Sequence, residues 1–179
     1  CPDQAIRIAK QVGMPLRMAA KVDPADRQYF ETQIEPLLDH PLIEFVGEIS
    51  DAQKNDFLGG AYAMLAPYDW PEPFGLVLIE ALACGTPVLA YRRGSIPEII
   101  DNGVSGFVCE TIEEMAAAVE KVGLLDRSRC RRIFDERFTV ERMATDYVAL
   151  YEKVLRAETP VKEWKVPAMN GHAETSQVL

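Results

Sequence analysis

The sequence predicts a doubly wound α/β domain, in which helices cover both faces of a parallel sheet. Segments with a helical spacing of apolar residues alternate with short apolar segments that are typical of strands. Because single helices separate these short segments, the pattern favours a parallel sheet. Ligands bind to such sheets at the carboxyl ends of the strands. We therefore expect the functional residues in the loops that follow the strands.

Turn and capping residues locate the elements in order along the chain. Asp23 and Pro24 are typical of a helix N-terminus, Gly85 of a helix end, and SIPE, from Ser95 to Glu98, of a capping box. The first predicted helix contains Ile6 and ends at Gly13, and a short one starts at Ser95. The other predicted helices are 23–38, 50–61, 74–84, 111–125, 126–138 and 139–157. The predicted strands are 16–20, 42–47, 62–67, 87–91 and 106–110.

Length and composition predict one domain followed by a tail. A chain of 179 residues with 48% hydrophobic residues can bury a core. From Thr159 the periodicity stops, so we expect a domain at 1–158 and a C-terminal tail at 159–179, with Trp164 as its one candidate anchor. The chain opens directly on a helical pattern, and we expect that the domain lacks its first strand.

Charge and residue usage exclude several classes of partner. The 28 acidic and 19 basic residues give a net charge of -9, which argues against nucleic acid and against an anionic membrane surface. The four cysteines form no C-x-x-C pair and the two histidines lie far apart, so we expect neither a disulfide framework nor a zinc site. No apolar stretch reaches the ~20 residues of a membrane span, and a cytoplasmic location fits best.

A carboxylate in an apolar helix is the first candidate functional residue. The helix predicted at 74–84 is apolar nearly all round, which indicates burial, and Glu80 is its one charged residue. Burying an ionised carboxylate is costly without a hydrogen-bonding partner, and no basic residue lies three or four positions away. Glu80 therefore either faces solvent on an edge helix or has a partner outside the helix.

A second carboxylate precedes the same helix. Glu72 lies between the strand predicted at 62–67 and the helix, in the sequence PEPFGL. Gly75 allows a ligand to approach the backbone, and free N–H groups at a helix N-terminus favour phosphate. Glu72 could equally be an acid that only complements the helix dipole. The pattern is thus a carboxylate, an anion site, and a second carboxylate about two turns along the helix.

The run EPFGLVLIE, followed by ALACGTPVLAY, GSIPEII and NGVSGFV, resembles the donor-binding half of the retaining glycosyltransferases of family four. The resemblance extends over about residues 4–157. It implies one Rossmann-like half of a GT-B fold, whose two halves face each other across a cleft. It also implies transfer of a sugar from a nucleotide diphosphate sugar to an acceptor hydroxyl, with retention. The sequence offers no acidic metal cluster, so we expect a reaction that needs no cofactor and no metal.

The resemblance also implies roles for individual residues. Glu80 would hold the ribose hydroxyls, and Glu72 would contact and place the transferred sugar, which makes it the candidate catalytic residue. The N–H groups of Phe74, Gly75 and Leu76 would meet the diphosphate and sugar. Val46 and Gly47 would border the base. Attack would occur on the same face, assisted by the leaving phosphate, and no protein nucleophile is implied.

The chain departs from the family pattern in its basic residues. The family's first strand and its G-R...K-G segment, which neutralises the diphosphate, are missing, and no basic residue lies between Lys54 and Arg92. The acceptor-binding domain is missing too, so we expect the chain alone to bind donor weakly and to transfer nothing. Two alternatives stay open: a sugar-nucleotide-binding module without catalysis, and an epimerase or phosphorylase of the same fold. Donor sugar, base and acceptor are not predicted.

Overall fold

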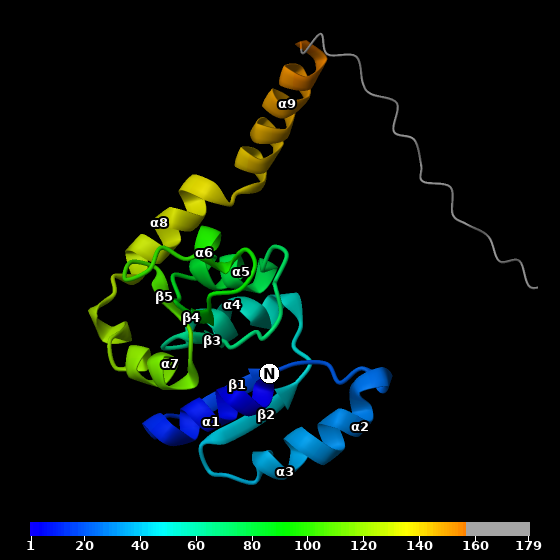
Figure 1. Ribbon diagram of the computed structural model, residues 1–179, viewed down its shortest axis with the longest axis vertical. Helices are drawn as coiled ribbons and strands as arrows, with labels where there is room; N and C mark the ends of the chain where they lie inside the picture. Colours follow the sequence, from blue (N-terminus) through cyan, green and yellow to red (C-terminus); the bar gives the residue numbers. More distant parts are fainter. Residues whose placement is uncertain (157–179) are drawn as a thin grey trace, which may run out of the picture. The chain divides into compact units, whose positions relative to one another are not determined.

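The computed structural model describes residues 1–156 and divides the chain into two compact units (Figure 1). The first unit is Cys1–Arg142, and the residues from Met143 onward belong to the second. The predicted tail and Trp164 lie outside the described residues. Within residues 1–156, no helix combines the length and the apolar content needed to cross a membrane. The strands are β1 (Leu16–Ala19), β2 (Ile43–Gly47), β3 (Met64–Ala66), β4 (Val88–Tyr91) and β5 (Gly106–Cys109).

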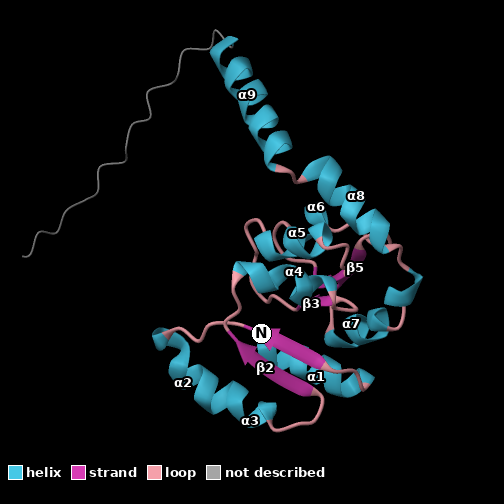
Figure 2. Ribbon diagram, turned by 180° about the vertical axis from the view of Figure 1, so that it is seen from behind, coloured by secondary structure: helices cyan, strands magenta, loops and turns pink. Residues whose placement is uncertain are grey.

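Helices separate most of these strands, as predicted (Figure 2). The helix expected at 23–38 consists instead of short 3-10, α and π segments, since Pro36, inside the segment, cannot donate the backbone hydrogen bond of a continuous α-helix. The helical segments are α1 (Pro2–Val12), η1 (Pro24–Asp26), α2 (Arg27–Tyr29), η2 (Phe30–Ile34), α3 (Glu35–Leu38), α4 (Asp51–Gly59), α5 (Leu76–Ala83), α6 (Ile96–Ile99), α7 (Ile112–Val119), η3 (Val122–Leu124), α8 (Arg127–Arg137) and α9 (Val140–Arg156).

All strand pairs in the described chain are parallel, which confirms the predicted fold class. The strands form two sheets, with the orders β1-β2 and β3-β4-β5, rather than one continuous sheet. β1 pairs with β2 from Leu16 opposite Ile43, and β3 pairs with β4 from Met64 opposite Val88. The break in the sheet therefore lies between β1 and β3.

β4 shows directly that helices cover both faces of the larger sheet. Its four residues are all buried, and they alternate between two hydrophobic clusters. Val88 and Ala90 face the cluster that contains Leu78 of α5, whereas Leu89 and Tyr91 face the cluster that contains Ile8 of α1. This alternation follows from the two-residue period of a strand, and it explains why the segment reads as a continuous apolar run.

Basic side chains of α8 hold the helices around β4 in place. The Arg127 guanidinium donates to the carbonyl oxygens of Gly59 and Ala61, at 2.8 and 2.6 Å, and to the Thr86 hydroxyl at 2.9 Å. Arg131 donates to the carbonyl of Ala83 at 3.0 Å, at the carboxyl end of α5. The orientation of α5 is therefore set at its carboxyl end by α8.

Substitution of Thr86 by Val should destabilise the fold. The fully buried Thr86 hydroxyl donates to the carbonyl oxygen of Leu58 at 2.7 Å and accepts from Arg127. Thr86→Val keeps the shape but leaves buried polar groups unpaired, so the free energy of unfolding should fall by about 1–3 kcal/mol in urea titrations. The control is Thr32→Val, whose exposed hydroxyl bonds to the Gln28 carbonyl, with an expected change within about 0.5 kcal/mol. Equal losses in the two variants would contradict this assignment.

Candidate functional site

The loop between β3 and α5 places Glu72 at the start of the helix. Its Oε1 accepts hydrogen bonds from the N–H groups of Gly75, at 2.9 Å, and Phe74, at 3.4 Å. Gly75 has φ of 82°, in the left-handed region that favours glycine, and a Cβ there would lie 2.9 Å from the side chain of Leu78. Backbone conformation and packing both require glycine at this position.

The predicted anion site is therefore occupied by a side chain of the protein itself. The carboxylate of Glu72 accepts from two of the three N–H groups that the resemblance assigns to the diphosphate and sugar, which matches the interpretation of Glu72 as an acid that complements the helix dipole. In the described chain, the N–H groups of Leu76 and Val77 have no recorded acceptor. Phe74 and Leu76 have exposed side chains. The helix N-terminus thus retains donors that an anion could use.

Glu80 has the partner outside its helix that the sequence required. Lys54, on α4, lies with its Nζ 3.0 Å from Glu80 Oε1 and 3.3 Å from Asp51 Oδ1. The side chains of Lys54 and Glu80 are 36% and 39% exposed, so the pair lies at the surface of the site rather than in the core. The hydrogen bond with Glu80, followed by that with Asp51, raises the pKa of Lys54. The lysine therefore stays charged at neutral pH.

The loop after β4 supports the loop that carries Glu72. The Ser95 N–H donates to the Glu72 carbonyl at 2.9 Å. Gly94 has φ of 51°, and a Cβ on it would lie 2.6 Å from the Glu72 nitrogen and 2.8 Å from the Pro71 carbonyl carbon. Only glycine allows this approach of the two backbones.

The capping box predicted for SIPE is wrong. Ser95 is the residue before α6, but its side chain makes no capping hydrogen bond, and within residues 1–156 its buried hydroxyl has no partner. Its backbone has φ of -74° and ψ of -10°, which is helical rather than the extended conformation of a capping residue. The conformation instead lets the Ser95 N–H reach Glu72.

A surface pocket of about 550 Å³ lies beside Glu72. Its lining combines that carboxylate with Phe74 and Ser95 and, on the far side, Glu98 and Arg137. The Arg137 guanidinium is already used, since it donates to the carbonyl of Glu98 and pairs with an aspartate, Asp101, at 2.9 Å. The pocket therefore offers polar groups to a ligand but no unpaired basic one.

Val46 and Gly47 lie at the carboxyl end of β2, in the smaller sheet. Gly47 has φ of 74°, and the pairing of β1 with β2 shifts in register here. The described residues show no hydrogen bond or ion pair that links this segment to Glu72 or Glu80. Their predicted place beside a base stays a prediction.

Three residues of the site were not predicted as parts of it. Lys54 was identified only as a basic residue, because its position opposite Glu80 depends on how α4 packs on α5. Gly94 was noted only as the first residue of GSIPEII. Tyr68 directly follows the strand at 62–67, which could have indicated it; burial, and then the charge of Glu72, raise its pKa. These side chains come together only through tertiary packing.

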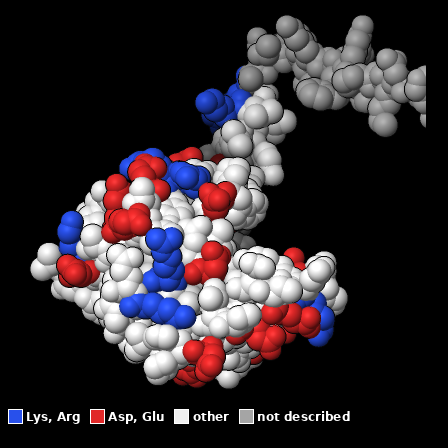
Figure 3. Space-filling model, turned by 60° about the horizontal axis from the view of Figure 1, so that its bottom comes forward, with Lys and Arg blue, Asp and Glu red and all other residues white. Residues whose placement is uncertain are grey.

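Both signs of charge occur on the face of the molecule that Figure 3 presents, where acidic and basic side chains are interspersed. In residues 1–156, no three His, Cys, Asp or Glu side chains are grouped in a way that could hold a metal ion. The site is thus built from two carboxylates, one lysine and backbone N–H groups.

Parallel strands with helices on both faces match one Rossmann-like half of the GT-B glycosyltransferase fold. The family described as glycosyl transferases group 1 matches residues 4–136, and the chain belongs to this family. Solved structures of the same fold include the HepE protein of Anabaena in complex with UDP and glucose, with a TM-score of 0.70, 22% identity, and coverage of 84% of this chain and 44% of that one.

Two curated relatives are similar over part of the chain. The N-acetyl-alpha-D-glucosaminyl L-malate synthase of Bacillus anthracis is 38% identical over 93 residues, which are 48% of this chain and 24% of the relative. The probable sucrose-phosphate synthase of Thermosipho melanesiensis is 40% identical over 98 residues, which are 52% of this chain and 22% of the relative. The matches thus span about a quarter of the length of these relatives.

Gly94→Ala should move the loop that carries Glu72. Gly103→Ala is the matched control, because Gly103 has φ of 78° but no atom within 4 Å of the added Cβ. Each substitution should cost about 1–2 kcal/mol for the left-handed backbone, and Gly94→Ala should cost more because of the contact with Glu72. The amide resonances of Phe74 and Gly75 should shift only in Gly94→Ala. Equal unfolding free energies and unchanged amides would show that Gly94 does not support the loop.

Proposed function

We propose that this chain is the donor-binding domain of a retaining glycosyltransferase, which transfers a sugar from a nucleotide diphosphate sugar to an acceptor hydroxyl. Membership of the family supports the reaction class, and the HepE protein, part of which has the same fold, was solved in complex with UDP and glucose. The observation that carries the proposal is the pair of carboxylates at one short helix, α5: Glu72 lies in the loop before its N-terminus, and Glu80 lies on the helix beside Lys54.

Donor binding would exchange the acceptors at the start of α5. The N–H groups of Phe74 and Gly75 donate to Glu72 in the free domain. A diphosphate oxygen can replace this carboxylate, with the N–H group of Leu76 as a further donor. The exchange would free Glu72 to contact hydroxyls of the transferred sugar. The helix N-terminus would then stabilise the negative charge that develops on the leaving phosphate.

The second carboxylate would hold the ribose. Hydroxyl groups of a ribose can donate to Glu80 in place of Lys54. Lys54 also contacts Asp51 at 3.3 Å, so it keeps an acidic partner when Glu80 turns to the ligand. Val46 and Gly47, at the end of β2, would border the base. This arrangement needs no large rearrangement of α5, whose carboxyl end is held by Arg131.

Transfer would proceed on one face of the sugar. The bond from the anomeric carbon to the β-phosphate oxygen breaks, the acceptor oxygen attacks from the same side, and its proton passes to the leaving phosphate. Because the charge develops on the phosphate and on the sugar, no protein nucleophile is required. Glu72 would place the sugar. Acceptor binding belongs to a second domain, so the chain alone should hold donor without transferring it.

We also propose that the reaction is independent of metal ions and takes place in the cytoplasm. Cys1, Cys84, Cys109 and Cys130 are all free, which supports a reducing compartment. Metal independence is tested with the full-length protein, in which sugar transfer should continue in the presence of a chelator. Loss of transfer in the chelator, with recovery on adding a divalent ion, would contradict metal independence.

Glu80→Gln should weaken binding of the preferred donor nucleotide. Calorimetric titration with UDP, GDP, ADP and their glucose and mannose forms identifies that nucleotide first. Removing the charge from a hydrogen-bonding partner costs about 1.5–3 kcal/mol, so Kd should rise by roughly 10-fold to 100-fold.

The matched control for this titration is Glu44→Gln. Glu44 also pairs with a basic side chain, that of Arg17 at 2.8 Å, but lies on β2 away from α5. Glu44→Gln should leave the Kd of the donor nucleotide unchanged. Equal effects of the two substitutions, or no effect of Glu80→Gln, would contradict the role of Glu80. If no nucleotide binds, the same titration is made with the full-length protein, and failure there would contradict the proposed function.

A further inference from the structure

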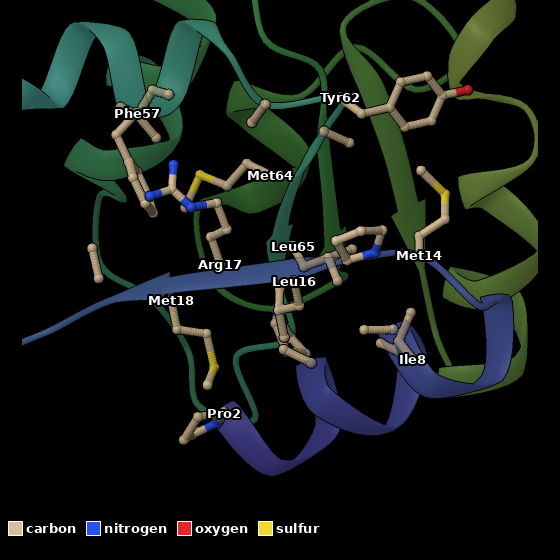
Figure 4. A pocket seen from close by; sticks show the side chains of 18 of the residues that line it. Pro2, Ile8, Met14, Leu16, Arg17, Met18, Phe57, Tyr62, Met64 and Leu65 are labelled. Carbon is tan, nitrogen blue, oxygen red and sulfur yellow. The ribbon is translucent and has the colours of Figure 1, made fainter. Parts of the chain in front are cut away.

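Two hollows of the first unit differ in the side chains that line them. The cavity of about 600 Å³ between β1 and β3 is lined mostly by apolar side chains, among them Met14, Leu16 and Met64 (Figure 4). The pocket of about 550 Å³ beside Glu72 is lined by polar side chains as well, and one of them is Ser95. The hydroxyl of this serine takes no part in the proposed exchange of acceptors at the start of α5.

The Ser95 hydroxyl is buried and has no hydrogen-bonding partner within residues 1–156. Its Oγ exposes less than 1 Å² to solvent, so bulk water does not replace the missing partner. A buried hydroxyl without a partner destabilises the state in which it occurs. Alanine would occupy the same place without this penalty. The hydroxyl therefore indicates a second state of the site, in which it is hydrogen-bonded.

The backbone of Ser95 is fixed, whereas its side chain is free to turn. The Ser95 N–H donates to the Glu72 carbonyl at 2.9 Å. The Ser95 carbonyl accepts from the N–H groups of Glu98 and Ile99, at 2.9 and 3.2 Å. Rotation about the Cα–Cβ bond moves Oγ between staggered positions and leaves these backbone bonds intact. The hydroxyl can therefore turn toward the pocket that the residue lines.

The charged side chains in the lining of this pocket differ in their need for a donor. Arg137 is itself a donor, and its guanidinium already bonds to a backbone carbonyl and to a carboxylate. Glu98 is exposed, so water can solvate its carboxylate. Glu72 is half-buried, and its Oε1 accepts from two backbone N–H groups in the free domain. Glu72 is thus the carboxylate of this pocket that would lose its donors when a diphosphate binds.

Donor binding would leave Glu72 in need of new hydrogen bonds. A diphosphate would take over the N–H groups of Phe74 and Gly75, and an unpaired carboxylate is costly to keep half-buried. Hydroxyls of the sugar can supply some of the new bonds. The Ser95 hydroxyl is a protein donor held beside this carboxylate, since a backbone hydrogen bond joins the two residues and both line the same pocket.

We propose that Ser95 is a positioning residue for the transferred sugar. In the donor-bound state its hydroxyl donates to the carboxylate of Glu72 and holds this carboxylate toward the sugar hydroxyls. The hydroxyl lacks an acceptor in the free domain, and the carboxylate lacks its backbone donors in the bound one, so a single hydrogen bond satisfies both groups. The inference rests on the proposed donor binding, and it assigns Ser95 to recognition of the sugar rather than of the nucleotide.

The first part of the test compares the stability of Ser95→Ala with that of the matched control Ser105→Ala. Ser105 is fully buried too, but its hydroxyl accepts from the Asp101 N–H at 3.0 Å. In urea titrations of the free domain, Ser105→Ala should raise the equilibrium constant of unfolding roughly tenfold, whereas Ser95→Ala should leave it unchanged or lower it. Equal losses of stability would show that the Ser95 hydroxyl already has a partner in the free domain, and would overturn the proposal.

The second part measures donor binding by calorimetric titration with three pairs of ligands: UDP and UDP-glucose, GDP and GDP-mannose, and ADP and ADP-glucose. For the pair that binds, Ser95→Ala should raise the Kd of the nucleotide sugar roughly tenfold, because a hydrogen bond to a charged group is lost. The Kd of the nucleotide alone should stay nearly unchanged, because water reaches Glu72 while no sugar fills the pocket. Ser105→Ala should change neither Kd. In a Glu72→Ala background, Ser95→Ala should have no further effect.

The outcomes separate this inference from the proposed function. Equal losses for nucleotide and nucleotide sugar, no loss for either, or a full loss in the Glu72→Ala background would overturn the role of Ser95, while binding by the unsubstituted chain would leave the proposed function intact. The same selective loss in Glu98→Gln would identify Glu98 as the partner of the hydroxyl, and would also overturn the proposal. If no pair binds to the chain, the full-length protein is titrated, and absence of binding there would contradict the proposed function and this inference together.

Discussion

The contact between the backbones of Gly94 and Glu72 is the constraint on which the site depends. It brings the loop after β4 against the loop after β3, and the Ser95 N–H adds a hydrogen bond of 2.9 Å to the Glu72 carbonyl. With its main chain held there, Glu72 can direct its carboxylate to the N–H groups of Phe74 and Gly75. The position of the carboxylate is thus set by main-chain contacts between neighbouring loops, rather than by packing of its side chain.

Local patterns sufficed for the strands, for most of the helices and for locating the two carboxylates, because all of these depend on short-range rules. The apolar segments became parallel strands, and Glu80 needed a partner because nothing on its own helix could supply one. The identity of that partner, Lys54, could not be predicted, since it depends on how two helices separated by β3 pack together. The capping box predicted for SIPE was wrong for the same reason, because a contact with the loop that carries Glu72 accompanies the helical conformation of Ser95.

The carboxylates of the site have different physical situations. Glu72 accepts hydrogen bonds from backbone N–H groups. These groups are dipoles that the main chain holds in place, and they carry no full charge. Glu80 is bound to a mobile ammonium group that has a second acceptor in Asp51. An incoming anion competes with the first carboxylate, whereas a neutral hydroxyl competes with the lysine for the second. One end of α5 is therefore suited to a charged ligand group, and the middle of the helix to a neutral polar one.

Helix α1 links the two sheets across the break between them. Ile8 packs in the same cluster as Leu89 and Met115, so α1 is anchored to the larger sheet although it leads into a strand of the smaller one. This helix keeps β1 in place next to a sheet with which it shares no hydrogen bond. A gap held open by packing in this way costs unpaired backbone groups along both edges.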